Sequence, residues 1–138
     1  MRKMDAREYI ENYETISYQI SLKESEIERW KGTATGSTGS SEGERVQSSV
    51  TKEKMANAVV TYTDIEREVE ALKEEQEAIK RNIQKLKGKQ LYLIYRHYVH
   101  GVSIKAIASS LGMSPSWGTT THARALASMQ KILDAEGM

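Results

Sequence analysis

The chain has 138 residues, a formal net charge of +1 and no cysteine, which is enough for one ordinary domain or for a small domain with an extended element. The absence of cysteine excludes disulfide bonds, thiolate catalysis and cysteine-based zinc sites. No run of about 18 apolar residues occurs, and the first residues lack the apolar segment of a signal peptide. We therefore expect a cytoplasmic protein that does not span a membrane.

Charge is distributed unevenly along the chain. Residues 89–133 carry five Lys or Arg and no Asp or Glu, whereas residues 1–88 carry 15 basic and 17 acidic residues. A basic segment on a neutral or acidic scaffold is typical of a nucleic-acid-binding domain.

The first predicted helix begins near Asp5, whose side chain can cap the amide groups of a first turn. Apolar residues then alternate at spacings of three and four, the rhythm that keeps one seam toward a partner helix. They are Ala6, Tyr9, Tyr13, Ile16, Ile20, Ile27 and Trp30, with Lys23 as a polar member. A simple amphipathic helix is the alternative to a coiled-coil-like seam.

Residues 31–49 are rich in Gly, Ser and Thr and predict a flexible loop. They do not match the phosphate-binding Gly-x-x-x-x-Gly-Lys-Ser/Thr pattern. A second, long helix is predicted over 51–87, with a stripe at the same alternating spacing. The stripe comprises Met55, Ala58, Tyr62, Ile65, Val69, Leu72, Gln76, Ile79, Ile83 and Leu86.

The two predicted helices can pair as an antiparallel hairpin covering residues 1–88. Because the first helix is predicted to be about ten residues shorter, part of the seam would stay open. This favours a homo-oligomer, with a dimer as the expected form, and a monomeric hairpin with a frayed tip is the alternative.

Residues 89–138 predict three short helices with turns between them. Gly88 ends or bends the long helix, and the next helix covers 90–99. Ser103 caps a helix over 104–111, Gly112 allows a left-handed turn, and Ser114 caps the last helix with Pro115 in its first position. Ala108 is small where the last helix must cross closely. This pattern predicts a helix-turn-helix domain at 89–138.

In a helix-turn-helix the start of the second helix enters the major groove of DNA. His122, Leu126, Met129 and Leu133 form the predicted inner stripe of that helix, which leaves its other positions for DNA. The candidate DNA-contacting residues are Ser114, Ser116, Trp117, Thr119 and Thr120, with Lys105, Arg124 and Lys131 placed to meet phosphates.

Four motifs carry a family resemblance: Leu91-x-x-Ile94-Tyr95-x-x-Tyr98, Gly101-Val102-Ser103-Ile104-x-x-Ile107-Ala108, Leu111-Gly112-Met113-Ser114 and Arg124-Ala125-Leu126. They resemble region four of bacterial sigma factors. The whole chain resembles the phage-encoded, sigma-like regulators of the RinA and ArpU type from Gram-positive bacteria and their prophages. This resemblance implies an all-α, DNA-binding activator of phage late genes that acts with the host RNA polymerase in the bacterial cytoplasm.

Gly118 departs from the family pattern, which has a buried Val or Ile there. We expect a gap at this position, which Trp117 either fills from the side or leaves open while contacting DNA. The final helix also carries Thr119 and Thr121 where basic residues are common in the family. A single copy is therefore expected to bind DNA weakly and with strong salt dependence.

Other readings of the chain remain. A small terminase subunit, which marks phage DNA for packaging, also combines a helix-turn-helix with an oligomerising helical part, and a coiled-coil adaptor would contact protein only.

Because no acid lies near His97, His100 or His122 in sequence, we expect no metal site and no cofactor. Tyr92 could be exposed, while Tyr95 and Tyr98 are expected in the core. No spacing supports a catalytic triad or paired carboxylates, so we expect no enzyme.

Overall fold

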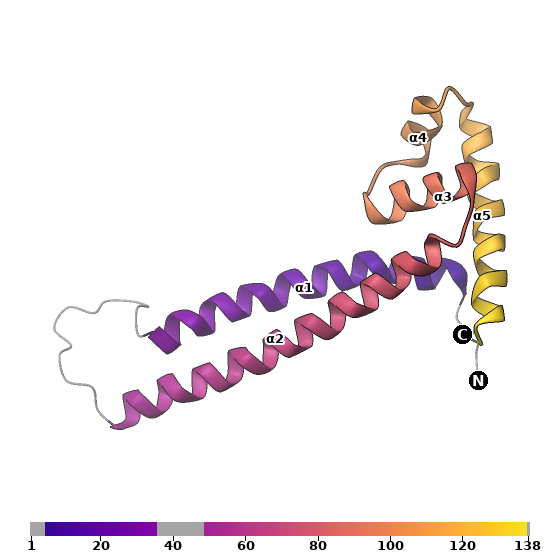
Figure 1. Cartoon of the computed structure of the whole chain (residues 1–138). Helices are drawn as coiled ribbons and strands as arrows, with labels where there is room; N and C mark the ends of the chain where they lie inside the picture. The colour runs from indigo at the N-terminus through magenta and orange to yellow at the C-terminus, as the bar shows by residue number, and fades with distance from the viewer. Residues whose placement is uncertain (1–4, 36–48, 138) are drawn as a thin grey trace. The chain divides into compact units, whose positions relative to one another are not determined.

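The structure, a computed structural model, describes residues 5–35 and 49–137, with side chains from residue 51 onward in the second range. Every regular element in these ranges is helical and no strand occurs in them, which confirms the predicted all-α class (Figure 1). The elements are α1 (Ala6–Thr35), α2 (Ser49–Ile83), α3 (Gly88–Ile94), the π-helical turn η1 (Tyr95–Val99), α4 (Ile104–Ser110) and α5 (Pro115–Ala135). No helix in the described ranges is both long and apolar enough to cross a bilayer.

The chain divides into two compact units, each considered by itself below. The C-terminal unit comprises Met1–Ile16 together with Glu75–Met138, and the middle unit comprises Ser17–Glu74. The compact unit around the last helices therefore includes more of the chain than the predicted domain at 89–138, because it also contains the start of α1 and the end of α2.

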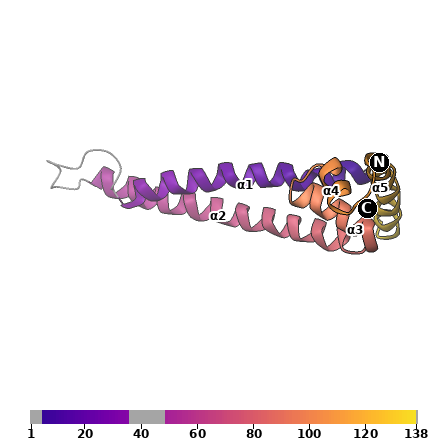
Figure 2. The ribbon, with the colours of Figure 1, turned by 90° about the horizontal axis from the view of Figure 1, so that it is seen from above.

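In the middle unit, α1 and α2 run antiparallel beside each other (Figures 1 and 2). Their facing stripes are buried as the spacing predicts, with Ile20, Ile27, Ala58, Ile65 and Val69 all at most 9% exposed. Ion pairs join the two helices at the edges of this seam. Lys23 Nζ lies 2.6 Å from Glu68 Oε1, and Lys31 Nζ lies 3.7 Å from Glu66 Oε2.

The loop predicted at 31–49 is wrong at both ends, because residues 31–35 continue α1 and Ser49 begins α2. Helix continues past Gly32 because side chains support the last turns of α1: Thr33 Oγ1 donates to the Arg29 carbonyl over 3.4 Å, and Lys31 pairs with Glu66. The rest of the predicted loop lies outside the described residues. The helices have 30 and 35 residues, a smaller difference than predicted, so unequal length gives little support for an open seam.

The C-terminal unit has an apolar core to which α1, α2, α3, α4 and α5 contribute. Its buried members are Ala6, Tyr9, Ile10 and Ile16 of α1, Ile79 and Ile83 of α2, Leu86 after α2, Leu93 and Ile94 of α3, Ile107 and Ala108 of α4, and Ala125, Met129 and Leu133 of α5. In this core α5 packs against both α3 and α4 (Figure 1).

Polar side chains tie the start of α1 to the rest of the C-terminal unit. The Ala6 amide, the first of α1, donates to Gln130 Oε1 of α5 over 2.8 Å. Buried Asn82 donates from Nδ2 to the Tyr9 hydroxyl over 2.6 Å, and Gln76 Nε2 donates to the Tyr13 carbonyl over 2.9 Å. These bonds satisfy polar groups that would otherwise destabilise a buried contact.

The long helix α2 ends at Ile83, four residues before the predicted end. Its last turn tightens, with the Leu86 amide donating to the Ile83 carbonyl over 2.9 Å, and this brings Leu86 into the core. Gly88 then adopts a left-handed φ of +59° and begins α3, two residues earlier than expected. The prediction that Gly88 ends the long helix is therefore wrong: α2 ends five residues earlier, and Gly88, whose missing side chain makes a left-handed φ inexpensive, begins α3 instead.

Candidate nucleic-acid interface

Helix α4 is short and well defined at its start. Ser103 Oγ accepts a hydrogen bond from the Ala106 amide over 3.1 Å, which confirms the predicted N-cap. Ile107 and Ala108 are buried on its inner side, and Lys105 is exposed on its outer side. The cap and the core contacts together orient the Lys105 side chain toward solvent.

The turn between α4 and α5 closes on α4 itself. The Met113 amide donates to the Ala108 carbonyl over 2.8 Å, and the Gly112 amide donates to the Ser109 carbonyl over 3.0 Å. Gly112 has a φ of +71°, as predicted for the left-handed position that ends a helix. The tight turn fixes where α5 starts relative to α4.

Helix α5 begins with the predicted cap and proline. Ser114 Oγ accepts from the Trp117 amide over 3.1 Å, and Pro115 occupies the first turn. Ser114 Oγ also lies 3.4 Å from Ser116 Oγ, and Thr119 Oγ1 donates to the Pro115 carbonyl over 3.4 Å. The Ser114 hydroxyl is therefore engaged in capping and the Thr119 hydroxyl in a bond within α5, and Ser114, Ser116 and Thr119 are all exposed.

One face of α5 is buried and the opposite face is exposed. Gly118, Ala125, Met129 and Leu133 form the buried stripe. Of the predicted inner stripe, Met129 and Leu133 are fully buried, whereas His122 and Leu126 are half-buried. At about 100° per residue, Ser116, Thr120, Arg124 and Lys131 fall within one narrow arc opposite the buried stripe, and all four are exposed.

The expectation of a gap at Gly118 is wrong. Gly118 is buried, and a Cβ atom there would lie 3.0 Å from Cγ2 of Ile104 and 3.3 Å from Cβ of Ala108. Helices α4 and α5 approach closely at this point, so Trp117 has no gap to fill. Trp117 itself is half-buried beside the exposed row.

The exposed row is electrically positive. Lys105, Arg124 and Lys131 form no ion pair with any acid in the described part of the chain, so their charges are available to a ligand. The nearest acids in sequence are at the end of α5. Of these, Glu136 pairs with Lys85, and Asp134 Oδ1 accepts from Gln130 Nε2 over 3.2 Å.

An aromatic cluster supports α5 from inside the C-terminal unit. The Tyr98 hydroxyl lies 2.7 Å from His122 Nε2, and the two rings are stacked at 5.7 Å. Burial, followed by the neighbouring charges of His97 and Arg7, lowers the pKa of His122 below its ordinary 6.5, while burial raises the pKa of the Tyr98 hydroxyl. The contact with the Tyr98 hydroxyl makes His122 a packed, hydrogen-bonded residue.

The π-helical turn η1 places this cluster. The His100 amide donates five residues back to the Tyr95 carbonyl over 3.3 Å, where the sequence predicts an unbroken α-helix over 90–99. His97 Nδ1 lies 2.7 Å from the Val102 carbonyl oxygen and so carries a proton there. Within the described residues, no three His, Asp or Glu side chains are grouped so that they could hold a metal ion.

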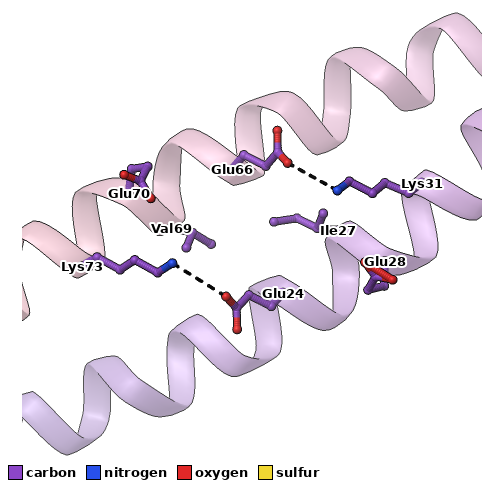
Figure 3. A pocket seen from close by; sticks show the side chains of 8 residues that line it. All are labelled: Glu24, Ile27, Glu28, Lys31, Glu66, Val69, Glu70 and Lys73. Atoms are coloured by element: carbon purple, nitrogen blue, oxygen red, sulfur yellow. Dashed lines mark ion pairs between the residues drawn. The ribbon is translucent and has the colours of Figure 1, made fainter.

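The middle unit has a shallow groove between α1 and α2 (Figure 3). Ile27 and Val69 lie between its walls, and charged residues occupy the rims. Lys31 pairs with Glu66, and Lys73 Nζ lies 4.0 Å from Glu24 Oε2. Charged residues of α2 therefore pair across the groove with residues of α1. We assign no chemistry to this groove.

Comparison with known proteins places the chain in no family: no family model matches it, and neither the curated proteins nor the solved structures give a match. The exposed row of α5 and Lys105 are therefore the features that bear on function. Ala123 and Ala127 also lie on the exposed side of α5. Small side chains there leave the row accessible.

Proposed function

We propose that the C-terminal unit binds double-stranded DNA, with α4 and α5 acting as a helix-turn-helix, and that the chain regulates transcription. The observation that carries the proposal is the exposed row of Ser116, Thr120, Arg124 and Lys131 along α5, opposite its buried stripe. A helix that presents hydroxyls near its start and cations farther along matches what major-groove binding requires.

The residues have distinct proposed roles. Thr120 and Ser116 contact base edges, because hydroxyls can donate to and accept from bases and the threonine methyl can touch thymine. Lys105, Arg124 and Lys131 contact phosphates and orient the unit on the duplex. The resemblance to sigma region four supports a role as a phage or prophage late-gene activator that acts with the host RNA polymerase.

The first experiment is selection of duplexes from a random library by the purified full chain, followed by titration of the enriched duplex at several salt concentrations. Three phosphate contacts predict a slope of log affinity against log salt of roughly −3. The Lys105→Ala, Arg124→Ala, Lys131→Ala triple variant should remove most of this slope. A matched triple variant at the exposed cations Arg29, Lys52 and Lys54 should keep it.

Absence of both enrichment and salt-dependent binding would refute the proposal and favour the adaptor. If a duplex is enriched, mapping its occupancy in an induced host separates the remaining classes. Occupancy upstream of a late-gene start supports transcriptional regulation, whereas occupancy confined to a packaging site would assign the chain to the small terminase subunits.

A further inference from the structure

We propose that the chain associates with a second copy of itself through Tyr18 and Leu22 of α1, which enter an apolar hollow on the outer side of α3 in the other copy. The inference deepens the proposed function, since it names the contact that would double the DNA-binding unit. The observations that support it are separate from the DNA interface.

The hollow lies in the C-terminal unit. It is lined mainly by apolar surface, from Gly88, Leu91, Tyr92 and Tyr95, and Gln84, Arg96 and His100 line it as well. Leu93 and Ile94, on the other side of α3, are fully buried in the core. Tyr92 is 41% exposed, and a Cβ atom at Gly88 would meet nothing within 4 Å, so the hollow is open to solvent.

The surroundings of the hollow are basic. Arg96 Nη1 lies 2.9 Å from His100 Nδ1 and donates to it. No carboxylate in the described residues forms an ion pair with Arg96, so its guanidinium charge is not neutralised. Lys89 is exposed next to Gly88. No acid lines the hollow, and none occurs between residues 89 and 133. An occupant with an apolar tip and acidic surroundings would complement both features.

The middle unit presents such an apolar tip, which consists of Tyr18 and Leu22 of α1. Tyr18 and Leu22 are 64% and 70% exposed, the largest exposures among the big apolar side chains that the structure describes. Their spacing of four puts them on one face of α1, and exposed Glu26 follows at the same spacing. Residues 17–74 hold eight basic and eleven acidic residues, so the unit that carries the tip is acidic.

A second copy of the chain would cover both the apolar tip and the hollow. Tip and hollow are both exposed in a single chain, and between them they account for three of the five exposed large apolar side chains among the described residues. Duplex DNA would leave the apolar floor of the hollow uncovered. Because a closed pair of identical chains repeats each contact, two small contacts together can hold a dimer in the micromolar range.

The test is sedimentation of the full chain without DNA, with two variants that alter exposed residues and should therefore keep the fold. Tyr18→Ser with Leu22→Ser removes the tip, and Tyr92→Glu blocks the hollow with a charge. Each variant alone should associate at least about tenfold more weakly than the native chain. An equimolar mixture should associate more strongly than either variant alone but more weakly than the native chain, because one intact tip and one intact hollow, hence one of the two contacts, remain between the two chains.

The matched control is Val60→Ser, which removes a 61% exposed apolar side chain elsewhere in the middle unit and should leave association unchanged. A native chain that is monomeric on the order of 100 µM overturns the proposal. So does unchanged association of either variant, an equal loss in Val60→Ser, or a mixture no more associated than its components. Since these measurements need no DNA, a monomeric protein that still selects a duplex would refute this inference and leave the proposed function intact.

Discussion

A Cβ atom at Gly118 of α5 would lie 3.3 Å from the Cβ atom of Ala108 of α4. The two helices therefore approach each other at a pair of the smallest residues, and the spacing sets how far the exposed face of α5 projects beyond α4. Thr119 and Thr120 directly follow the contact. Packing at Gly118 is thus linked to the geometry of the proposed interface.

Gly118→Val should destabilise the C-terminal unit. The new side chain would meet Ile104 Cγ2 at 3.0 Å from its Cβ atom, and such overpacking costs about 1–3 kcal/mol. The helical preference that Val gains over Gly is less than ~1 kcal/mol and does not offset this cost. We expect a melting temperature several degrees lower, measured by circular dichroism. Ala123→Val, on the exposed side of α5, is the control, and an unchanged or raised melting temperature for Gly118→Val would show that the site has room.

Thr120→Ala should reduce sequence discrimination. Loss of the hydroxyl and methyl contacts to a base edge should cost about 1–3 kcal/mol on the selected duplex and little on random DNA. Fluorescence anisotropy with both duplexes measures the difference. Equal losses on the two duplexes would remove Thr120 from base reading.

Lys105→Ala should weaken selected and random duplexes alike, because a phosphate contact carries no sequence information. The slope of log affinity against log salt should become shallower by roughly 1. Lys52→Ala, an exposed lysine of the middle unit, serves as the control. A loss confined to the selected duplex would point to a base contact by Lys105 instead.

The free energy of unfolding should fall as the pH decreases below about 6.5, the ordinary pKa of histidine. Burial lowers the pKa of His122 in the folded chain, so the unfolded chain binds more protons in this range and acidification favours it. The slope should stay well below the limit of about 1.4 kcal/mol per pH unit, since His122 is only half-buried. Urea titrations between about pH 7 and pH 5.5, above the range where most carboxylates titrate, measure it. His122→Gln should flatten the slope and His100→Gln should not, and identical slopes in all three proteins would contradict the assignment.

A fragment of residues 89–138 should lack a cooperative unfolding transition. Cutting there removes Ala6, which donates to Gln130, and Lys85, which pairs with Glu136, and it also removes the fully buried Ile10 and Ile83. A chain in which a short Gly/Ser linker replaces Ser17–Glu74 retains the whole C-terminal unit and should keep a cooperative transition. Thermal melts by circular dichroism distinguish the two, and a stable 89–138 fragment would show that the start of α1 is dispensable.

Local signals in the sequence predicted the local features of the site. Ser103 and Ser114 were predicted as caps and Gly112 as a left-handed residue, because each depends on a few neighbouring backbone groups. Ala108 was also predicted correctly as the small residue at a helix crossing. The exposed row of α5 follows from helical periodicity once its buried stripe is known.

Features that depend on distances between helices could not be predicted in this way. Gly118 looks the same in sequence whether it leaves a gap or permits a close contact, and only the position of Ile104 separates these cases. Ile10 lies outside the predicted stripe of α1 yet is fully buried, because α1 is surrounded on more than one side near its start. Gln130 and Asn82 read as ordinary polar residues, and their partners are far away in sequence.

The bond between Ala6 and Gln130 joins residues 124 positions apart, so the C-terminal unit can fold only late during synthesis of the chain. At about 5–20 residues per second of synthesis, the start of α1 waits roughly 6–25 s for the part of α5 that covers it. The middle unit is contiguous in sequence and can pair its helices during that interval. The DNA-binding activity proposed for the C-terminal unit would then begin only after the last turns of α5 have been made, so that a nascent or truncated chain would not compete for DNA.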